Sequence, residues 1–587
     1  MFGGEPGRVA ECDECYRSGD CGTDTSFLLP TQLAVRVFSA YPDRPLRTRA
    51  RTVICDGQVQ VPEVRHTVPR KRGPTQPVHG VVASGDPAGW TVAELRSHLE
   101  ERDISSSEVV TSLINRIELV DHAGASVRSV LAISEDAVVT ARARDSERLS
   151  GVIRGPLHGI PILVKDNIDT ATGAATTAGS LALQATIPSD DAWVVQRLRA
   201  AGAIVIGKTN LSEWANFRSR RSSSGWSAVG GQTRNPYVLD RSPGGSSSGS
   251  AAAVAAGFAP LAVGTETDGS ILCPAALCGV VGIKPTVGRV SRTGVVPISF
   301  TQDTVGTFAR SVADASILLA AIAMPDPADL ATMSAKSVPF SGTVARGADG
   351  LRGTRIGVVR EDHWGYSAAS DALLEAALAQ ISAAGAILVE PADIRTITAL
   401  RESHDERLVL LHEFKVGVER YLRGRISPTG TGPRSLSDLV AFNQIHPDRE
   451  LAWFGQDIFV EAEATAGLEV PMYRRARARG LHRARTMGID ATLAEHNVVA
   501  LLAPTLGPAW CIDLVNGDPP HRNGFKAAAI AGYPAITIPV GITSGLPVGL
   551  CLIGSAWDEG RLTEIAAGIE SALQVRMIPT FLSSVPQ

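Results

Sequence analysis

Between Ser242 and Gly288 the chain passes through a loop of glycine and serine and then through a long apolar stretch with few charges. The loop, residues 244–250, is followed directly by an alanine-rich segment for which we predict a helix to about residue 257. A loop of this kind gathers hydroxyl groups and free backbone N–H groups at the positive end of the helix dipole. A solvated serine linker is the alternative, but so much apolar sequence would not follow a linker. We therefore interpret the loop as part of a functional site.

A second cluster of small and polar residues, residues 264–270 (GTETDGS), follows the predicted helix. Glycine lets consecutive backbone N–H groups turn toward one point, which is the arrangement that stabilises a developing oxyanion. Ser270 ends this turn. Because clusters of Gly, Ser and Thr are also common in ordinary turns, the heptapeptide alone is a weak signal. It gains weight from the loop that precedes it.

The composition excludes several classes of function. The chain has 587 residues, of which 44% are hydrophobic and 20% charged, and its formal net charge is −4. This balance gives no electrostatic basis for binding nucleic acid or an anionic membrane. No apolar stretch approaches the roughly 18 to 20 residues of a membrane-spanning helix, and the first residues lack the layout of a secretory signal. We expect a cytoplasmic protein with no nucleic-acid or membrane partner, and its oligomeric state stays open.

Residues 1–85 differ in texture from the rest of the chain. They are rich in Arg, Pro, Gly and Thr and show no sustained period, so we expect a poorly ordered N-terminal extension. The segment contains Cys12, Cys15, Cys21 and Cys55, whose role stays open. Cys12 and Cys15 have the spacing of half a zinc or redox motif, but no second Cys/His pair follows at ligand spacing. We therefore expect no metal and no cofactor.

From residue 86 to residue 580 we expect one large α/β domain without repeats or linkers. A capping box at Thr91 and Glu94 begins the first helix. Helical spacing of apolar residues predicts further helices from about residue 105, over 134–149 and over 191–201. Short apolar runs predict strands of a largely buried sheet at 160–164, 203–207, 355–359, 386–389, 498–503, 535–540 and 549–553.

Three motifs occur in order in this part of the chain: Gly-Gly-Ser-Ser at 244–247, Gly-Thr-x-x-x-Gly-Ser at 264–270, and Cys-Gly-Val-Val-Gly-x-Lys-Pro-Thr at 278–286. Together they resemble the amidase-signature family. The resemblance extends over about residues 86–580, through 155–169, 207–215 and 531–554. It implies a single amidase-signature domain with a mixed, mostly buried central sheet covered by helices. It also implies an enzyme that cleaves carboxamides to a carboxylate and ammonia through a serine acyl-enzyme.

The resemblance implies roles for individual residues. Lys165, in Val-Lys-Asp-Asn, matches the base of the family. Ser246 matches a bridging serine, whose preceding peptide bond is cis in the family, and Ser270 matches the nucleophile. The oxyanion hole is matched by the backbone N–H groups of Thr267, Asp268, Gly269 and Ser270.

The proposed base must be neutral to work. Lysine has a usual pKa of about 10.4, so it accepts a proton only where its surroundings favour the neutral amine. The apolar run that precedes Lys165 provides such surroundings by desolvation. The alternative is a structural ion pair between Lys165 and Asp166. In the catalytic interpretation, Ser246 passes the proton of Ser270 to Lys165 and returns it to the leaving ammonia.

Residues 245–249 also fit Gly-x-Ser-x-Gly, the nucleophile elbow of α/β-hydrolases. In that interpretation Ser247 is the nucleophile and His521 is its histidine. An elbow needs a buried strand directly before it, and residues 236–243 are a poor strand. We therefore reject the elbow.

One departure from the family pattern bears on the substrate. Most members have Thr-Asp-Thr-Gly-Gly-Ser where this chain has Thr-Glu-Thr-Asp-Gly-Ser. With 223–227 and 230–237, this resembles the peptide-amidase branch, which removes the terminal amide of C-terminally amidated peptides. The alternatives are the glutaminase (A) subunit of a tRNA-dependent amidotransferase and a non-catalytic scaffold, which the intact set of three residues disfavours. The candidates for substrate contacts, which fit core positions equally well, are Trp214, Phe217, Trp226 and Tyr237.

Overall fold

The structure is a computed structural model that describes residues 85–171, 174–345, 347–425, 432–575 and 577–586. The expected extension with Cys12, Cys15, Cys21 and Cys55 lies outside the described residues, apart from residue 85. All of the described residues belong to one compact unit. Among them, no helix is long and apolar enough to cross a membrane.

A mixed sheet of eleven strands forms the centre of the fold, in the order β1-β3-β2-β6-β8-β7-β12-β13-β11-β9-β10. Strand β2 is parallel to both of its neighbours, β3 and β6, whereas β8 is antiparallel to β6. Strands β4 and β5 form a separate pair. The strands are β1 Val130–Ile133, β2 Pro161–Lys165, β3 Ile204–Thr209, β4 Trp226–Ser227, β5 Gly231–Gln232, β6 Leu261–Glu266, β7 Val281–Lys284, β8 Thr304–Ala309, β9 Arg355–Val358, β10 Ile387–Val389, β11 Ala500–Pro504, β12 Ala535–Thr543 and β13 Leu546–Ile553.

Helices cover both faces of this sheet. The α-helices are α1 Val92–Glu101, α2 Ser106–Arg116, α3 Ala137–Leu149, α4 Trp193–Ala200, α5 Ser248–Ala255, α6 Leu272–Leu277, α7 Val312–Ile322, α8 Ala368–Ala383, α9 Ile397–Glu402, α10 Asp405–Arg425, α11 Leu436–Ile445, α12 Pro447–Glu450, α13 Asp457–Glu463, α14 Pro471–Ala484, α15 Asp490–Glu495, α16 Lys526–Ala531 and α17 Glu559–Leu573. Short 3₁₀ or π segments are η1 Pro87–Gly89, η2 Ile117–Ala123, η3 Leu181–Leu183, η4 Glu213–Asn216, η5 Leu330–Ser337, η6 Gly347–Leu351 and η7 Arg485–Ile489.

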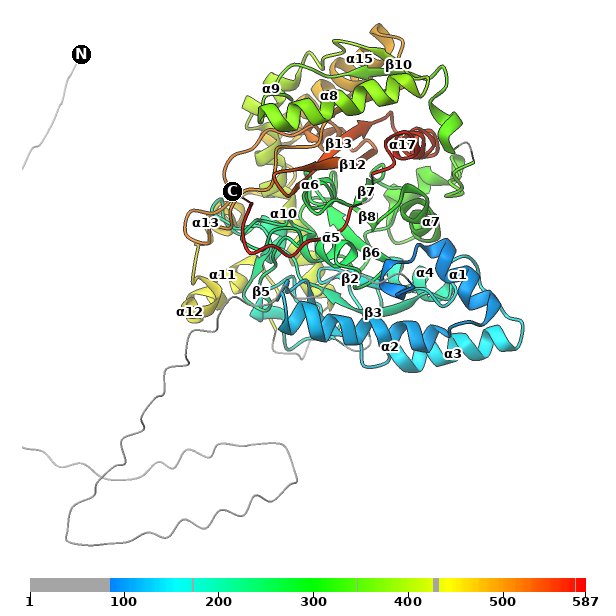
Figure 1. The fold of residues 1–587 in the computed structure, drawn as a ribbon. Helices are drawn as coiled ribbons and strands as arrows, with labels where there is room; N and C mark the ends of the chain where they lie inside the picture. Colours follow the sequence, from blue (N-terminus) through cyan, green and yellow to red (C-terminus); the bar gives the residue numbers. More distant parts are fainter. Residues whose placement is uncertain (1–84, 172–173, 346, 426–431, 576, 587) are drawn as a thin grey trace, which may run out of the picture. The chain divides into compact units, whose positions relative to one another are not determined.

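Strand residues alternate between two hydrophobic cores, one on each face of the sheet. In β6, Leu261 and Val263 belong to the core that also contains residues of α4, α7 and α17, whereas Ala262 belongs to the core that contains α5 and α6. Figure 1 shows α4, α7 and α17 to the right of the sheet and α5 and α6 to its left. Successive side chains of a strand point to opposite faces, so strands covered on both sides must be apolar throughout. The predicted buried α/β sheet is confirmed.

The end of the sheet that matters for function is set by β2, β6 and β8. Lys165 is the last residue of β2 and Glu266 is the last residue of β6. Because β2 and β6 are parallel neighbours, these two residues lie at the same edge. Thr304, the first residue of β8, pairs with Glu266. In sheets of this kind, ligands bind beyond the carboxyl ends of the parallel strands.

Candidate active site

Lys165 lies at the edge of the sheet with its side chain fully buried. Its Nζ is 2.8 Å from Ser246 Oγ, 2.8 Å from Thr265 Oγ1 and 3.4 Å from the backbone oxygen of Thr265. A neutral amine has two N–H groups and one lone pair. The two oxygens of Thr265 can accept both hydrogens, so the lone pair of a neutral Lys165 faces the hydroxyl of Ser246.

Burial lowers the pKa of Lys165 to about 7, although the charges of Asp303 and Glu266 act in the opposite direction. Burial dominates because the side chain has no exposed surface and the charged ammonium loses its hydration. No ion pair joins Lys165 to a carboxylate within the described part of the chain. Near neutral pH the amine is therefore able to accept a proton.

The alternative ion pair with Asp166 is absent. Asp166 Oδ1 is 3.3 Å from Lys208 Nζ, and its Oδ2 accepts hydrogen bonds from the backbone N–H and the hydroxyl of Thr177. The carboxylate therefore has its own partners, and the side chain of Lys165 points to a different set of atoms.

Ser246 is held in a loop that ends at the N-terminus of α5. The peptide bond between Gly245 and Ser246 is cis, as the resemblance implied. A Cβ atom on Gly245 would lie 2.3 Å from Ser212 Oγ, so only glycine fits at this position. The backbone oxygen of Ser246 accepts a hydrogen bond from the N–H of Ser212. These contacts leave the Ser246 hydroxyl facing Lys165.

The neighbouring serines bind backbone atoms instead. Ser247 Oγ donates to the carbonyl of Thr265 at 3.0 Å and accepts from its N–H at 3.2 Å. Ser248 Oγ donates to the carbonyl of Gly244. Residues 236–243 form no strand of the sheet, and the exposed His521 stacks on Trp510. The geometry of a nucleophile elbow around Ser247 is therefore missing.

Residues 267–270 form the loop that follows β6. Glu266 Oε2 accepts hydrogen bonds from the N–H groups of Ile271 and Leu272, which ties the end of the strand to the start of α6. Within the described residues, no hydrogen bond is donated by the N–H groups of Asp268, Gly269 and Ser270. Converging amides without a partner are what an oxyanion hole requires.

Ser246 and Ser270 line the same narrow cavity. Its wall also contains Thr265, Asn167 and Asp303. Asn167 Nδ2 donates to Thr265 Oγ1 at 2.9 Å and so fixes the hydroxyl that Lys165 contacts. Sequence reasoning did not assign a role to these three residues. Asn167 and Thr265 lie inside motifs that it used, whereas Asp303 carries no local signal.

Asp303 is a buried carboxyl group next to the loop. It accepts hydrogen bonds from Thr267 Oγ1 at 2.5 Å and from the N–H groups of Ile298 and Ser299 at 2.8 Å. Burial raises the pKa of Asp303 to about 6, against the effect of these hydrogen bonds. At pH 7 it is mainly ionised and adds negative charge close to Lys165.

None of the four predicted aromatic contacts lines this cavity. Trp214 and Trp226 are buried and pack edge-on against Phe459 and Phe454. Tyr237 is 1% exposed and belongs to the core beside α6. As the structure stands, these three side chains are core residues, because neighbouring rings and the C-terminal segment cover them. Phe217 is half-buried and packs against Phe414 of α10.

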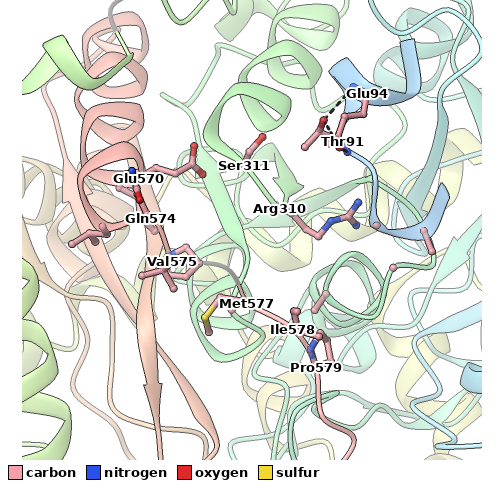
Figure 2. Close-up of a pocket in the computed structure, with 18 residues that line it drawn as sticks. Thr91, Glu94, Arg310, Ser311, Glu570, Gln574, Val575, Met577, Ile578 and Pro579 are labelled. Atoms are coloured by element: carbon pink, nitrogen blue, oxygen red, sulfur yellow. Dashed lines mark hydrogen bonds between the residues drawn. The ribbon is translucent and has the colours of Figure 1, made fainter. Parts of the chain in front are cut away.

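A larger cavity, of about 380 Å³, lies at the other end of β6 and β8. Figure 2 shows its wall, which includes Arg310 and Ser311 after β8 and Glu570 and Gln574 at the end of α17. It contains none of the predicted catalytic residues. A possible metal-binding group in the described residues, His98, Glu101 and Asp103, is exposed at the end of α1 and is separate from Lys165 and the two serines.

The comparisons with known proteins agree with this geometry. A family model described as Amidase matches residues 108–448. A probable amidase from Arabidopsis thaliana is 38% identical over 503 residues, which cover 84% of this chain and 92% of the relative. The chain belongs to the amidase family. It is therefore an amide-hydrolysing enzyme, and the predicted family is confirmed.

Solved structures and other relatives place this amidase more closely. The native peptide amidase from Stenotrophomonas maltophilia is 50% identical, with a TM-score of 0.79 and coverage of 84% of this chain and 98% of that one. The glutamyl-tRNA(Gln) amidotransferase of Acidothermus cellulolyticus has an A-type subunit that is 36% identical over 509 residues, which cover 84% of this amidase and 97% of the relative. The predicted single amidase-signature domain is confirmed by the first of these.

Proposed function

We propose that this amidase hydrolyses the terminal amide of C-terminally amidated peptides or related small amides, with Ser270 as nucleophile, Ser246 as relay and Lys165 as base. The observation that carries the proposal is the 2.8 Å contact between the buried Lys165 Nζ and Ser246 Oγ, in a cavity that Ser270 also lines. The pKa of Lys165 near 7 suits a general base at neutral pH.

In the proposed reaction, Ser270 Oγ attacks the amide carbon while its proton moves to Ser246 Oγ. The proton of Ser246 moves at the same time to Lys165 Nζ. Collapse of the tetrahedral intermediate breaks the C–N bond, and the two protons return along the same path so that ammonia leaves. Water then attacks the acyl-enzyme by the same route, which releases the carboxylate and restores Ser270.

The negative charge of the tetrahedral intermediate falls on the former carbonyl oxygen. The N–H groups of the 267–270 loop are the proposed donors to this oxygen. Such donors accelerate acyl transfer because they are already oriented before the charge develops. No metal or cofactor enters the proposed steps.

The pH dependence of the reaction depends on the carboxylate of Asp303. This charge raises the pKa of Lys165, so the substitution Asp303→Asn should lower that pKa and move the acid limb of kcat/KM to lower pH. The measurement is a pH profile of kcat/KM for the two enzymes. Asp326→Asn is the control, since Asp326 is equally buried but accepts hydrogen bonds from Ser291 and Thr293. A shift to higher pH would contradict the assignment of Lys165 as base.

The peptide-amide substrate is supported by the 50% identity to the Stenotrophomonas maltophilia peptide amidase and by Asp268 in the oxyanion loop. The aromatic ring of Phe217, two residues from the cavity-lining Ala215, is our candidate for a substrate contact. Trp214 is adjacent to Ala215, but its ring is turned into the core.

A glutaminase role is the second candidate, because the relative from the Acidothermus cellulolyticus amidotransferase covers 84% of this chain at 36% identity. Ammonia release by the purified chain distinguishes the two roles. We expect release from an amidated dipeptide at a kcat/KM at least about 100-fold above that for free glutamine, the discrimination that about 2.7 kcal/mol provides. Equal rates, or release from glutamine alone, would overturn the peptide-amide assignment.

A further inference from the structure

The oxyanion loop is held on its outer side by side chains from distant elements. Lys526, the first residue of α16, has its Nζ 2.8 Å from Asp268 Oδ2. The same ammonium pairs with Glu406 in the first turn of α10. Gln302 Nε2 donates to Glu406 Oε1 at 3.0 Å and lies 3.4 Å from the backbone oxygen of Thr267. A connected network therefore reaches from α16 through α10 to the loop.

The residue before Lys526 contacts the residue after Asp268. A Cβ atom on Gly269 would lie 2.2 Å from Cε2 of the Phe525 ring, and Gly269 has a φ of +85°. Both observations require glycine at this position. Two consecutive residues at the start of α16, Phe525 and Lys526, thus fix two consecutive residues of the loop, Gly269 and Asp268.

The charges of this network are mostly shielded from water. The side chains of Lys526 and Glu406 are 18% and 11% exposed. Burial lowers the pKa of Lys526, but the charges of Asp268 and Glu406 outweigh this effect and raise the pKa above its usual value. Lys526 therefore keeps its charge at any working pH, in contrast to Lys165. It can hold the two carboxylates but cannot act as a base.

The contacts leave the inner side of the loop free. Asp268 is bound through its side chain and Gly269 through its packing, while their N–H groups donate no hydrogen bond to another described residue. A loop with unpaired N–H groups would otherwise rotate to satisfy them with other partners. Fixing it from the outside keeps the amide dipoles directed at one point without blocking them.

We propose that Lys526 is a positioning residue for the reaction: by holding Asp268 between α16 and α10, it orients the backbone N–H groups of residues 268–270 toward the carbonyl oxygen of a bound amide. The inference rests on the proposed serine mechanism. It assigns a role to the aspartate that replaces the glycine of most family members in this loop. A donor that is held in place stabilises the transition state, and one that must reorganise loses this advantage.

The test compares Lys526→Met with Lys415→Met. Lys415 is a control on α10, with a side chain 23% exposed and an ion pair to Glu463, and it has no contact with the loop. We expect Lys526→Met to lower both kcat and the rate of Ser270 phosphonylation by a fluorophosphonate by about 10- to 100-fold, with KM changed less than about 3-fold. Lys415→Met should stay within about 2-fold of wild type in all three quantities, and Lys526→Arg should recover most of the loss, because it keeps the charge.

A second readout separates positioning from general damage. A peptide aldehyde, which forms a tetrahedral adduct with the nucleophile, should lose affinity for Lys526→Met by the same factor as kcat/KM. The peptide carboxylate product should bind both enzymes equally. Equal losses for aldehyde and product, or a Lys526→Met enzyme as active as Lys415→Met, would overturn the inference.

If Lys526→Met does not fold, Asp268→Asn gives the same test from the other side of the ion pair. It should lower the phosphonylation rate by about 10-fold or more, and a rate equal to wild type would overturn the proposal. A wild-type enzyme that neither reacts with the fluorophosphonate nor releases ammonia would instead overturn the proposed serine mechanism. A reactive wild type with unaffected variants would overturn only the role of Lys526.

Discussion

Replacement of Ser270 by alanine should lower kcat by about 10⁴- to 10⁶-fold, the range found when a catalytic serine is removed. The change deletes the attacking oxygen and little volume, and within the described residues the Ser270 hydroxyl makes no hydrogen bond that the fold would lose. The thermal midpoint should therefore stay within a few degrees of wild type. Ammonia release and a thermal melt of the same preparation are the two measurements.

Ser247→Ala is the matched control for this variant. Its hydroxyl bonds the backbone of Thr265 in both directions, so its removal should cost stability, by about 1 to 3 kcal/mol for the buried groups left unpaired. Activity should remain measurable in the folded fraction. The reverse pattern, with an active Ser270→Ala and an inactive but stable Ser247→Ala, would restore the nucleophile elbow.

Lys165→Arg should lower kcat/KM by at least about 10³-fold, and Lys165→Ala by a similar factor, since both remove the only proposed proton acceptor. A guanidinium stays protonated at any working pH and cannot accept the proton of Ser246. A lysine with a purely electrostatic role would give the opposite result, because arginine preserves the charge. Steady-state turnover, with circular dichroism to check the fold, distinguishes the two. A folded Lys165→Arg enzyme with nearly wild-type turnover would exclude Lys165 as base.

The sequence predicted the residues around the catalytic serines because the chemistry is encoded locally. Ser246 and Ser270 lie in glycine-rich loops that begin or follow regular elements, and Lys165 ends an apolar run. Their assembly also follows from simple topology, since the parallel strands β2 and β6 bring their carboxyl ends to one edge of the sheet. Motif and topology together were sufficient for this part.

Contacts made over long sequence distances were not predictable. Asp303 contacts Thr267 across 36 positions, and Lys526 contacts Asp268 across 258, and neither residue belongs to a motif with a known chemical role. Strands β6, β7 and β8 were also missed. Residues of β6 and β7 were interpreted only as parts of motifs, and β8 contains glycine and threonine, which weaken the apolar signal of a strand.

The aromatic residues show a limit of a different kind. Trp214, Trp226 and Tyr237 were candidates for the substrate wall because large rings near a functional loop often contact ligands. The sequence does not encode which way a ring points, and packing against Phe459, Phe454 and the core around α6 turned these three inward. Burial therefore decides between core and contact only once the fold is known.

The rate of Ser270 phosphonylation by a fluorophosphonate, measured against pH with the modified residue identified by mass spectrometry, tests the central claim most directly. The reagent reports on the nucleophile and its base without any assumption about the natural amide. Burial places the pKa of Lys165 at about 7, so the rate in wild type should rise with pH through about 7 to a plateau, with the adduct on Ser270. A rate that is independent of pH between about 5 and 9, or an adduct on Ser247, would contradict a neutral Lys165 acting through Ser246 on Ser270.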